Sequence, residues 1–442
     1  MQRFLFFGCQ LSKSLIMKKV ISVGNAICTL FLFTFIVSSC VKDNCKGSYT
    51  YSYYTPVYKT TAEVRSNIKS SAAQPIENPG KIVILNNFIF LNDVDKGIHI
   101  IDNSNPASPK NAAFISIPGN VDLAVKGTTL YADLYTDLVT LDITDPMNVV
   151  VKNYNQGVFP YRNYGYGFYG DSTKIITQWI RRDTTIPQPC GGGQRILYTN
   201  TNPGIYMVGT PQNFSSANAG SPIGQGGSMA RFALVNNYLY TVDDNNLNIF
   251  NISNSQNPTF SDKVQVDYHV ETIYPFENKL FIGSNNGMFI YDIQSSPESP
   301  VKSGEFTHAR SCDPVIADGE YAFITLHSGT TCLGYNNELD VVKLNSFTDA
   351  SLVKIYNLTS PQGLSKDGNL LFICDGTDGL KIFDASDVSY LKLVKHIPNL
   401  ETYDVIARNN IALVVAKDGL YQFNYSDISH INLISKIGLS NN

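Results

Sequence analysis

The stretch Gly97-Ile98-His99-Ile100-Ile101-Asp102 decides the fold of this chain, because seven further hexapeptides repeat its pattern. Apolar residues stand at the second, fourth and fifth places, and Asp or Asn usually stands at the sixth. The other hexapeptides are DLVTLD (137–142), GIYMVG (204–209), NLNIFN (246–251), GMFIYD (287–292), ELDVVK (338–343), GLKIFD (379–384) and GLYQFN (419–424). The alternation of apolar and polar residues predicts that each hexapeptide is a β-strand.

The spacing of the hexapeptides predicts the architecture. Their last residues are 40, 67, 42, 41, 51, 41 and 40 residues apart, so the period is near 40, with excesses of 27 and 11 residues. Such a period is typical of a propeller blade of four short strands. Further strands are expected before the hexapeptides, at 88–91, 129–134, 238–242, 279–283, 321–326, 370–374 and 411–416. We therefore predict an all-β fold over residues 80–442: a β-propeller of eight four-stranded blades, with seven blades as the alternative.

Composition supports a large globular domain and argues against nucleic acid as a partner. The chain has 43% hydrophobic and 16% charged residues, which is ample material for a core. Its 33 basic and 37 acidic residues give a net charge of −4, without a basic run after the N-terminus. The electrostatic footprint of a nucleic-acid-binding protein is therefore missing.

Residues 1–39 are expected to be a signal peptide, with Met17 as a possible true start. Lys18 and Lys19 precede the apolar stretch Val20 to Val37, and small residues lead to Cys40. This pattern looks like a lipobox, in which the cysteine receives a lipid that palmitate labelling would detect. A transmembrane anchor is the alternative, because 18 apolar residues are near the lower limit for a span.

The interpretation as a lipoprotein sets the expected location. The chain would be exported and lipid-anchored to the cell envelope, with the outer membrane as the expected site and either its periplasmic or its surface face possible. Residues 40–79 would form a lipidated tether. A capping box of Thr60 and Glu63 predicts a short helix over 61–69 within it.

Cysteine usage fits an oxidising compartment. Cys374 lies in an apolar run and is expected to be a buried free thiol. Cys312, at the entry to an inner strand, and Cys332, in a loop of the same predicted blade, are expected to form a disulfide. The sequence does not assign Cys45 and Cys190.

The hexapeptides and the turns after them resemble a known repeat. Turns such as Ile143-Thr144-Asp145-Pro146 follow the strands, with side chains that hydrogen-bond their own backbone and a proline that fixes φ. Together they are similar to the LVIVD repeat, a β-propeller repeat of bacterial secreted proteins and lipoproteins. The resemblance runs from about Gly80 to Ile437 and implies a propeller, usually without an assigned reaction. Gly209 and Lys343 depart from the pattern.

Motifs of catalysis, cofactors and metals are not found in the sequence. It has no zinc-protease motif, nucleophile elbow or P-loop, and GYGFYG (165–170) lacks the strand-turn-helix setting of a dinucleotide site. Paired carboxylates recur in loops, for example Asp93 with Asp95 and Asp375 with Asp378. Tight hairpins need such residues, and no loop carries the full ligand set of a calcium site. We therefore expect neither a cofactor nor a metal.

A propeller usually binds its ligands on the rim where the inner strands begin. The residues expected there mix both signs of charge with aromatic groups, which suits a polar ligand such as a glycan or a peptide. Arg162 and Arg231 break the repeat pattern, whereas an Asp at this place is often structural. The candidates are Asp122, Arg162, Arg231, His269, Glu271, His308, Asp313, His327 and Tyr403.

The function that follows is a binding or interaction module for a polar ligand or an envelope protein, held at the membrane by its lipid anchor. Two alternatives stay open. A propeller enzyme of the glycosidase or lyase type would need a close pair of groups, such as Glu271 with Asp313 or His308 with His327. A structural subunit of an envelope complex would use the sides of the blades instead.

Overall fold

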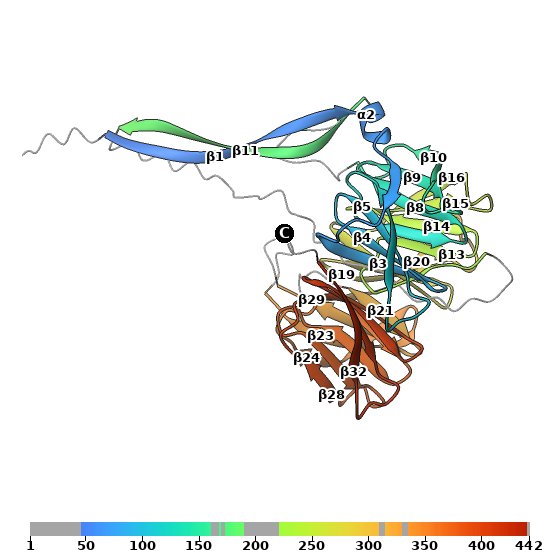
Figure 1. The fold of residues 1–442 in the computed structure, drawn as a ribbon. Helices are drawn as coiled ribbons and strands as arrows, with labels where there is room; N and C mark the ends of the chain where they lie inside the picture. Colours follow the sequence, from blue (N-terminus) through green and yellow to red (C-terminus); the bar gives the residue numbers. More distant parts are fainter. Residues whose placement is uncertain are drawn as a thin grey trace, which may run out of the picture. The chain divides into compact units, whose positions relative to one another are not determined.

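The computed structural model describes residues 46–160, 168, 173–189, 221–308, 314–328 and 335–439. These residues form almost entirely β-structure. Seven antiparallel sheets follow one another along the chain as the blades of a propeller, and in each the strands run in chain order from the inside to the outside (Figure 1). Neighbouring blades contact each other through their first strands.

The strands of the seven blades have the following bounds. Blades 1 to 3 are β3 (Pro79–Leu85), β4 (Phe88–Asp93), β5 (Gly97–Asp102) and β6 (Lys110–Ser116); β7 (Leu123–Lys126), β8 (Thr129–Leu134), β9 (Asp137–Asp142) and β10 (Val150–Asn155); and β13 (Phe232–Val235), β14 (Tyr238–Val242), β15 (Asn246–Asn251) and β16 (Thr259–Gln265). Blades 4 and 5 are β17 (Val270–Phe276), β18 (Lys279–Ser284), β19 (Gly287–Asp292) and β20 (Val301–Thr307); and β21 (Val315–Asp318), β22 (Tyr321–Leu326), β23 (Glu338–Ser346) and β24 (Asp349–Asn357). Blades 6 and 7 are β25 (Leu364–Asp367), β26 (Leu370–Cys374), β27 (Leu380–Asp384) and β28 (Lys392–Ile397); and β29 (Thr402–Arg408), β30 (Ile411–Ala416), β31 (Gly419–Asn424) and β32 (Asn432–Gly438).

The prediction of eight blades is wrong, and the alternative of seven is confirmed. Seven hexapeptides form the third strands of the blades. The eighth, which ends at Gly209, lies outside the described residues. Blade 2 packs directly on blade 3, because Tyr131 and Leu138 share one buried cluster with Phe232 and Leu239. The excess of 27 residues therefore belongs to a long excursion between blades 2 and 3 and not to a blade of its own.

The ring closes through apolar packing between blades 1 and 7. Ile82, Ile89 and Leu91 of blade 1 form one buried cluster with Ile406 and Leu413 of blade 7. In Figure 1 the blue strands of the first blade lie beside the red strands of the last. Each of these two blades owns four strands, so the predicted closure without strand exchange is observed.

The hexapeptide pattern has a direct structural meaning. Ile98, Ile100 and Ile101 are buried in the core. Glycine opens several hexapeptides because the backbone there turns to positive φ and lies against the neighbouring strand. At Gly379, with a φ of +90°, an added Cβ would lie 2.0 Å from the carbonyl oxygen of Ile397. Cys374 is a buried free thiol, as predicted, and burial raises its pKa.

The chain before blade 1 forms three elements. In the first, β1 (Lys46–Thr60) pairs with β11 (Lys174–Pro189), from the excursion after blade 2, in a two-stranded sheet. The second is α2 (Thr61–Arg65), which begins at the predicted capping box of Thr60 and Glu63 but is shorter than expected. The third is β2 (Lys69–Ala72), which adds a strand to the outer edge of blade 1 beside β6.

Helix α2 is fastened to blade 2 by the side chain of Arg65. Its Nη2 donates to Asp137 Oδ2 at 2.7 Å, and its guanidinium group lies 4.2 Å from the centre of the Tyr154 ring. Among the described residues, no helix is long and apolar enough to span a membrane.

Candidate functional site

The middle of the propeller is filled by the chain's own residues 221–231, which we call the channel segment. It begins at the end of the propeller where the inner strands finish. The Gly127 N–H, just past β7, donates to the Pro222 carbonyl oxygen at 2.7 Å, and the Gly224 N–H donates to that of Val125 at 2.7 Å. The next two residues form β12 (Gln225–Gly226), which pairs with β3.

The channel segment continues to the end where the inner strands begin. The Leu364 N–H, at the start of β25, donates to Ser228 Oγ at 2.7 Å. The Ile273 N–H donates to the Ala230 carbonyl oxygen at 2.7 Å, and the Arg231 N–H donates to Asp122 Oδ2, just ahead of β7, at 2.7 Å. The segment thus passes through the ring and bonds to blades 1, 2, 4 and 6 before it enters β13.

Small residues allow the channel segment to approach blade 7. A Cβ added at Gly227 would lie 2.3 Å from Asp404 Oδ2, and one at Gly363 would lie 2.2 Å from Asp404 Oδ1. The Asp404 carboxylate is buried in this contact. Real side chains do not tolerate such distances, so both positions need glycine for the segment to fit beside Asp404.

A buried ion pair lies where the channel segment leaves the ring. Lys81 Nζ donates to Asp122 Oδ2 at 2.6 Å, and both side chains are buried. Burial lowers the pKa of Lys81 to about 8, Asp122 opposes this shift, and the nearby charge of Arg231 adds to it. Arg231 Nε is buried and has no hydrogen-bond partner among the described residues. Because Asp122 also accepts the Arg231 N–H, its carboxylate joins blades 1, 2 and 3.

The recurrent carboxylates of the loops bind backbone N–H groups. Asp93 accepts the N–H groups of Glu77 and Asn78, and Asp375 accepts those of Thr359 and Ser360. Each carboxylate thereby fixes the loop that leads into the inner strand of its own blade. Within the part of the chain that the structure describes, no group of three or more His, Cys, Asp and Glu side chains could hold a metal ion.

Exposed polar and aromatic side chains gather on the rim of blades 4 and 5 where the inner strands begin. Tyr268 and Tyr335, in loops of these two blades, are 64% and 95% exposed. His269 is also exposed, and its Nδ1 lies 3.1 Å from Asp244 Oδ1. We call this set the rim patch: Tyr268, His269, Glu271, His308, His327 and Tyr335.

A buried carboxylate, Asp340 of β23, lies in blade 5 near the rim patch. Only 3% of the residue is exposed, and its Oδ1 has no hydrogen-bond partner among the described residues. Burial raises the pKa of Asp340 to about 6, the charge of Glu338 adds to this rise, and that of His308 opposes it. The shift therefore links Asp340 to a histidine of the rim patch.

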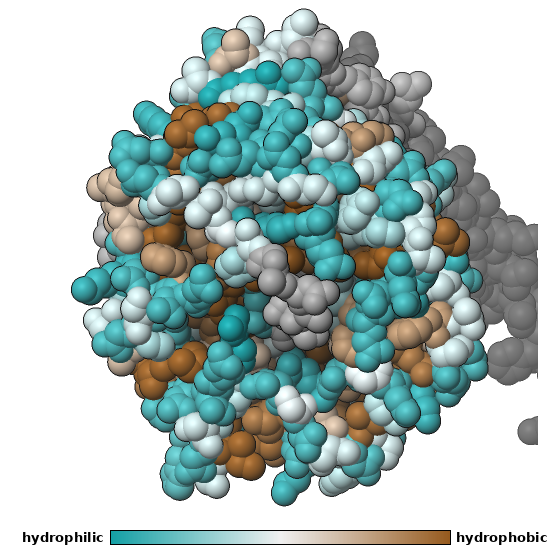
Figure 2. Space-filling view, turned by 90° about the vertical axis from the view of Figure 1, so that its right-hand side faces the viewer, coloured by the Kyte–Doolittle hydropathy of each residue, from teal (hydrophilic) through white to brown (hydrophobic). Residues whose placement is uncertain are grey.

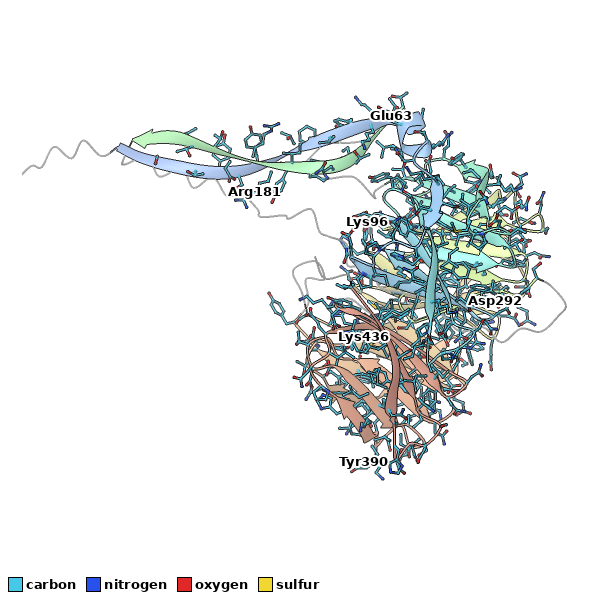
Figure 3. The ribbon with its side chains drawn as sticks, viewed as in Figure 1. Glu63, Lys96, Arg181, Asp292, Tyr390 and Lys436 are labelled. Carbon is cyan, nitrogen blue, oxygen red and sulfur yellow. The ribbon has the colours of Figure 1, made fainter. Side chains whose placement is uncertain are left out.

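The two rims of the propeller are on opposite sides. Lys96 lies in a loop on the rim where the inner strands begin, and Asp292 lies at the far end of its blade; Figure 3 labels both, on opposite sides of the propeller. Figure 2 shows the side toward Asp292, which is mainly hydrophilic with hydrophobic residues in small groups. Tyr390, in the turn between β27 and β28, is 74% exposed on this second rim.

The predicted site residues separate into two groups. Asp122 and Arg231 meet at the channel segment, whereas His269, Glu271, His308 and His327 belong to the rim patch. Tyr403 lies in β29, half-buried, and burial together with Glu401 raises its pKa to about 12. The remaining predictions fall outside the described residues and stay predictions: Cys40, Arg162, Cys312, Asp313 and Cys332.

Sequence reasoning missed Lys81, Tyr268 and Tyr335. Lys81 had a usable signal, because it is the one charged residue of the apolar strand β3 and so implies a buried counter-charge. The tyrosines had none, since a loop tyrosine can equally well pack against the domain.

The comparison with protein families finds the LVIVD repeat in three parts of the chain, at residues 79–113, 226–266 and 361–397. The resemblance seen in the sequence is confirmed: these stretches match blades 1, 3 and 6. A search of curated proteins found no match.

Solved structures show the same fold at low identity. A protein from Lactobacillus plantarum matches with a TM-score of 0.51 and 12% identity, over 82% of this chain and 96% of that one. The computationally designed Ika8 protein has a TM-score of 0.49 and 9% identity, over 83% and 89% of the two chains. BamB from Moraxella catarrhalis has a TM-score of 0.47 and 8% identity, over 84% and 97%. At these identities the similarity concerns the fold alone.

Proposed function

We propose that this LVIVD-repeat propeller is an exported, membrane-anchored interaction module that binds a protein partner or a polar ligand at the rim patch. The observation that carries the proposal is the exposure of Tyr268 and Tyr335 beside three histidines on one rim. Tyrosine combines a large apolar ring with a hydroxyl group and loses little conformational entropy on binding, so it is frequent in binding surfaces.

The filled channel supports the rim as the place of binding. The channel segment occupies the space in which a propeller could hold a small ligand, and it is hydrogen-bonded to several blades. An enzyme acting inside the channel would have to displace this segment. A partner on the rim would not.

Photocross-linking in intact envelopes tests the proposed surface. A benzoylphenylalanine would replace Tyr268 or Tyr335, and the same residue at Tyr390, exposed on the other rim, is the matched control. We expect cross-linked products from positions 268 and 335 and none from 390. Equal cross-linking from both rims, or cross-links from 390 alone, would contradict the proposal. A glycan array probed with the wild type and with Tyr268→Ser/Tyr335→Ser distinguishes a glycan from a protein.

The proposed anchor has its own test, because it depends on Cys40. Cys40→Ala is expected to abolish labelling with palmitate and to release the protein from the membrane. If this variant stays in the membrane after a carbonate wash, the stretch Val20 to Val37 is a transmembrane span, and the lipid anchor is wrong.

A further inference from the structure

The sheet formed by β1 and β11 has two chemically different faces. On one face, Thr50 Oγ1 lies 2.7 Å from Thr185 Oγ1, and Ser52 Oγ donates to Asp183 Oδ1 at 2.5 Å. Arg181 joins them, because its Nη2 donates to Ser52 Oγ at 2.8 Å. These contacts set Thr50 opposite Thr185 and Ser52 opposite Asp183, so this face is a continuous polar network.

The other face carries tyrosine and isoleucine. Successive side chains of a strand point to opposite faces, so Tyr51 and Tyr53 lie on the same side as Arg182 and Ile186. We call these four residues the aromatic face. The rings of Tyr51 and Tyr53 are 6.1 Å apart, and Tyr53 and Ile186 are each 41% exposed.

A two-stranded sheet of this kind needs something to pack against. Two strands alone cannot enclose a core, and isolated hairpins are marginally stable in water. The polar face satisfies its own hydroxyl and carboxylate groups, so it can remain in water. The aromatic face is therefore the side that gains from being covered.

We propose that the aromatic face rests on the surface of a lipid bilayer. Five residues, 41–45, separate Cys40 from β1, and a chain of that length reaches at most about 18 Å. The inference rests on the proposed membrane anchor. A lipid on Cys40 and a span over Val20 to Val37 would both bring this face close to the membrane.

The residues of the aromatic face fit the interfacial region of a bilayer. Tyrosine prefers this zone, because its ring enters the apolar boundary while its hydroxyl stays hydrated. Arg182 can extend its charge toward anionic headgroups. The open edges of both strands need water for their backbone groups, so the sheet would lie on the bilayer and would not cross it.

Vesicle flotation of a chain without its anchor tests this inference. The whole described fold lies within residues 46–439, so a protein of residues 41–442 retains it. We expect this protein to float with vesicles of phosphatidylethanolamine and phosphatidylglycerol. Tyr51→Ser/Tyr53→Ser/Ile186→Ser should lower the bound fraction by at least about tenfold. The matched control, Thr50→Ser/Thr185→Ser, changes the polar face and should bind like the wild type, and thermal unfolding should show an intact propeller in both variants.

Three results would overturn the inference. The wild type might fail to float, or the control might lose as much binding as the triple variant. A photocross-linker at Tyr53 in intact envelopes might capture a protein and no lipid, which would make a protein the occupant of this face. None of these results depends on Cys40, so they are separable from a failure of the proposed anchor.

Discussion

Two buried aspartates show how the partners of a carboxylate decide its role. Asp122 accepts Lys81 and the Arg231 N–H, and it holds three blades together at the end of the channel segment. Asp340 is as deeply buried, yet its Oδ1 has no hydrogen-bond partner among the described residues. A buried charge with incomplete hydrogen bonding lowers stability, so Asp340 is a cost to the fold at neutral pH.

Replacing Asp340 should stabilise the protein in a pH-dependent way. Its pKa is about 6 in the folded state and 3.8 in an ordinary environment. Between about pH 4 and pH 6 the folded chain binds a proton that the unfolded chain has lost, so its stability falls as the pH rises through this window. Asp340→Asn, which introduces the residue that blade 3 has at the equivalent Asn248, removes this loss.

The expected gain for Asp340→Asn is about 2–3 kcal/mol at pH 7, from a shift of roughly two pH units, and it should vanish near pH 4. Denaturant unfolding at several pH values measures it. Glu338→Gln is the control: it removes the second cause of the raised pKa and should give a smaller gain. A gain that does not change with pH would show that Asp340 ionises normally.

At the scale of elements, the channel segment depends on close approach. Gly227 faces the Asp404 carboxylate, which comes within 2.3 Å of the place a Cβ would take. Gly227→Ala should therefore force the segment or Asp404 to move, and it should lower the free energy of unfolding by about 1–3 kcal/mol. It should also make the segment more sensitive to proteases.

Gly438→Ala is the matched control for that variant, because the nearest heavy atom to an added Cβ lies 3.8 Å away. Denaturant unfolding and limited proteolysis, with cleavage sites identified by mass spectrometry, compare the two. If Gly227→Ala is as stable and as resistant as Gly438→Ala, the channel segment does not pack against Asp404 in solution.

At the scale of the whole molecule, the ring is closed by side chains alone. Ile406 is fully buried in the cluster that joins blades 1 and 7, and Ile273 is fully buried in the cluster that joins blades 3 and 4. If the closure is as tight as the other interfaces, Ile406→Ala and Ile273→Ala should cost a similar 2–5 kcal/mol, by the usual range of about that size for such truncations. Calorimetry or denaturant unfolding measures both. A much smaller cost for Ile406→Ala would mean that the ring opens between its first and last blades.

The sequence by itself determined the local structure of this protein. Alternation in the hexapeptides, turn residues such as Asp145-Pro146, and the capping box of Thr60 and Glu63 act over a few residues, so they could be read directly. The buried thiol of Cys374 followed from its apolar neighbours. The residues that begin the inner strands were also predicted, although their partners were not.

Only the tertiary structure decided the number of blades and the course of the channel segment. The stretch between Asp142 and Asn251 could contain a blade or an excursion, and the packing of Tyr131 against Phe232 and Leu239 is what excludes the blade. The sequence held one hint, because no preceding strand was found for the hexapeptide ending at Gly209. The Lys81–Asp122 pair and the contact of Gly227 with Asp404 likewise join residues far apart in the chain. Such contacts depend on how the ring closes, and closure is a property of all the blades together, which no local pattern encodes.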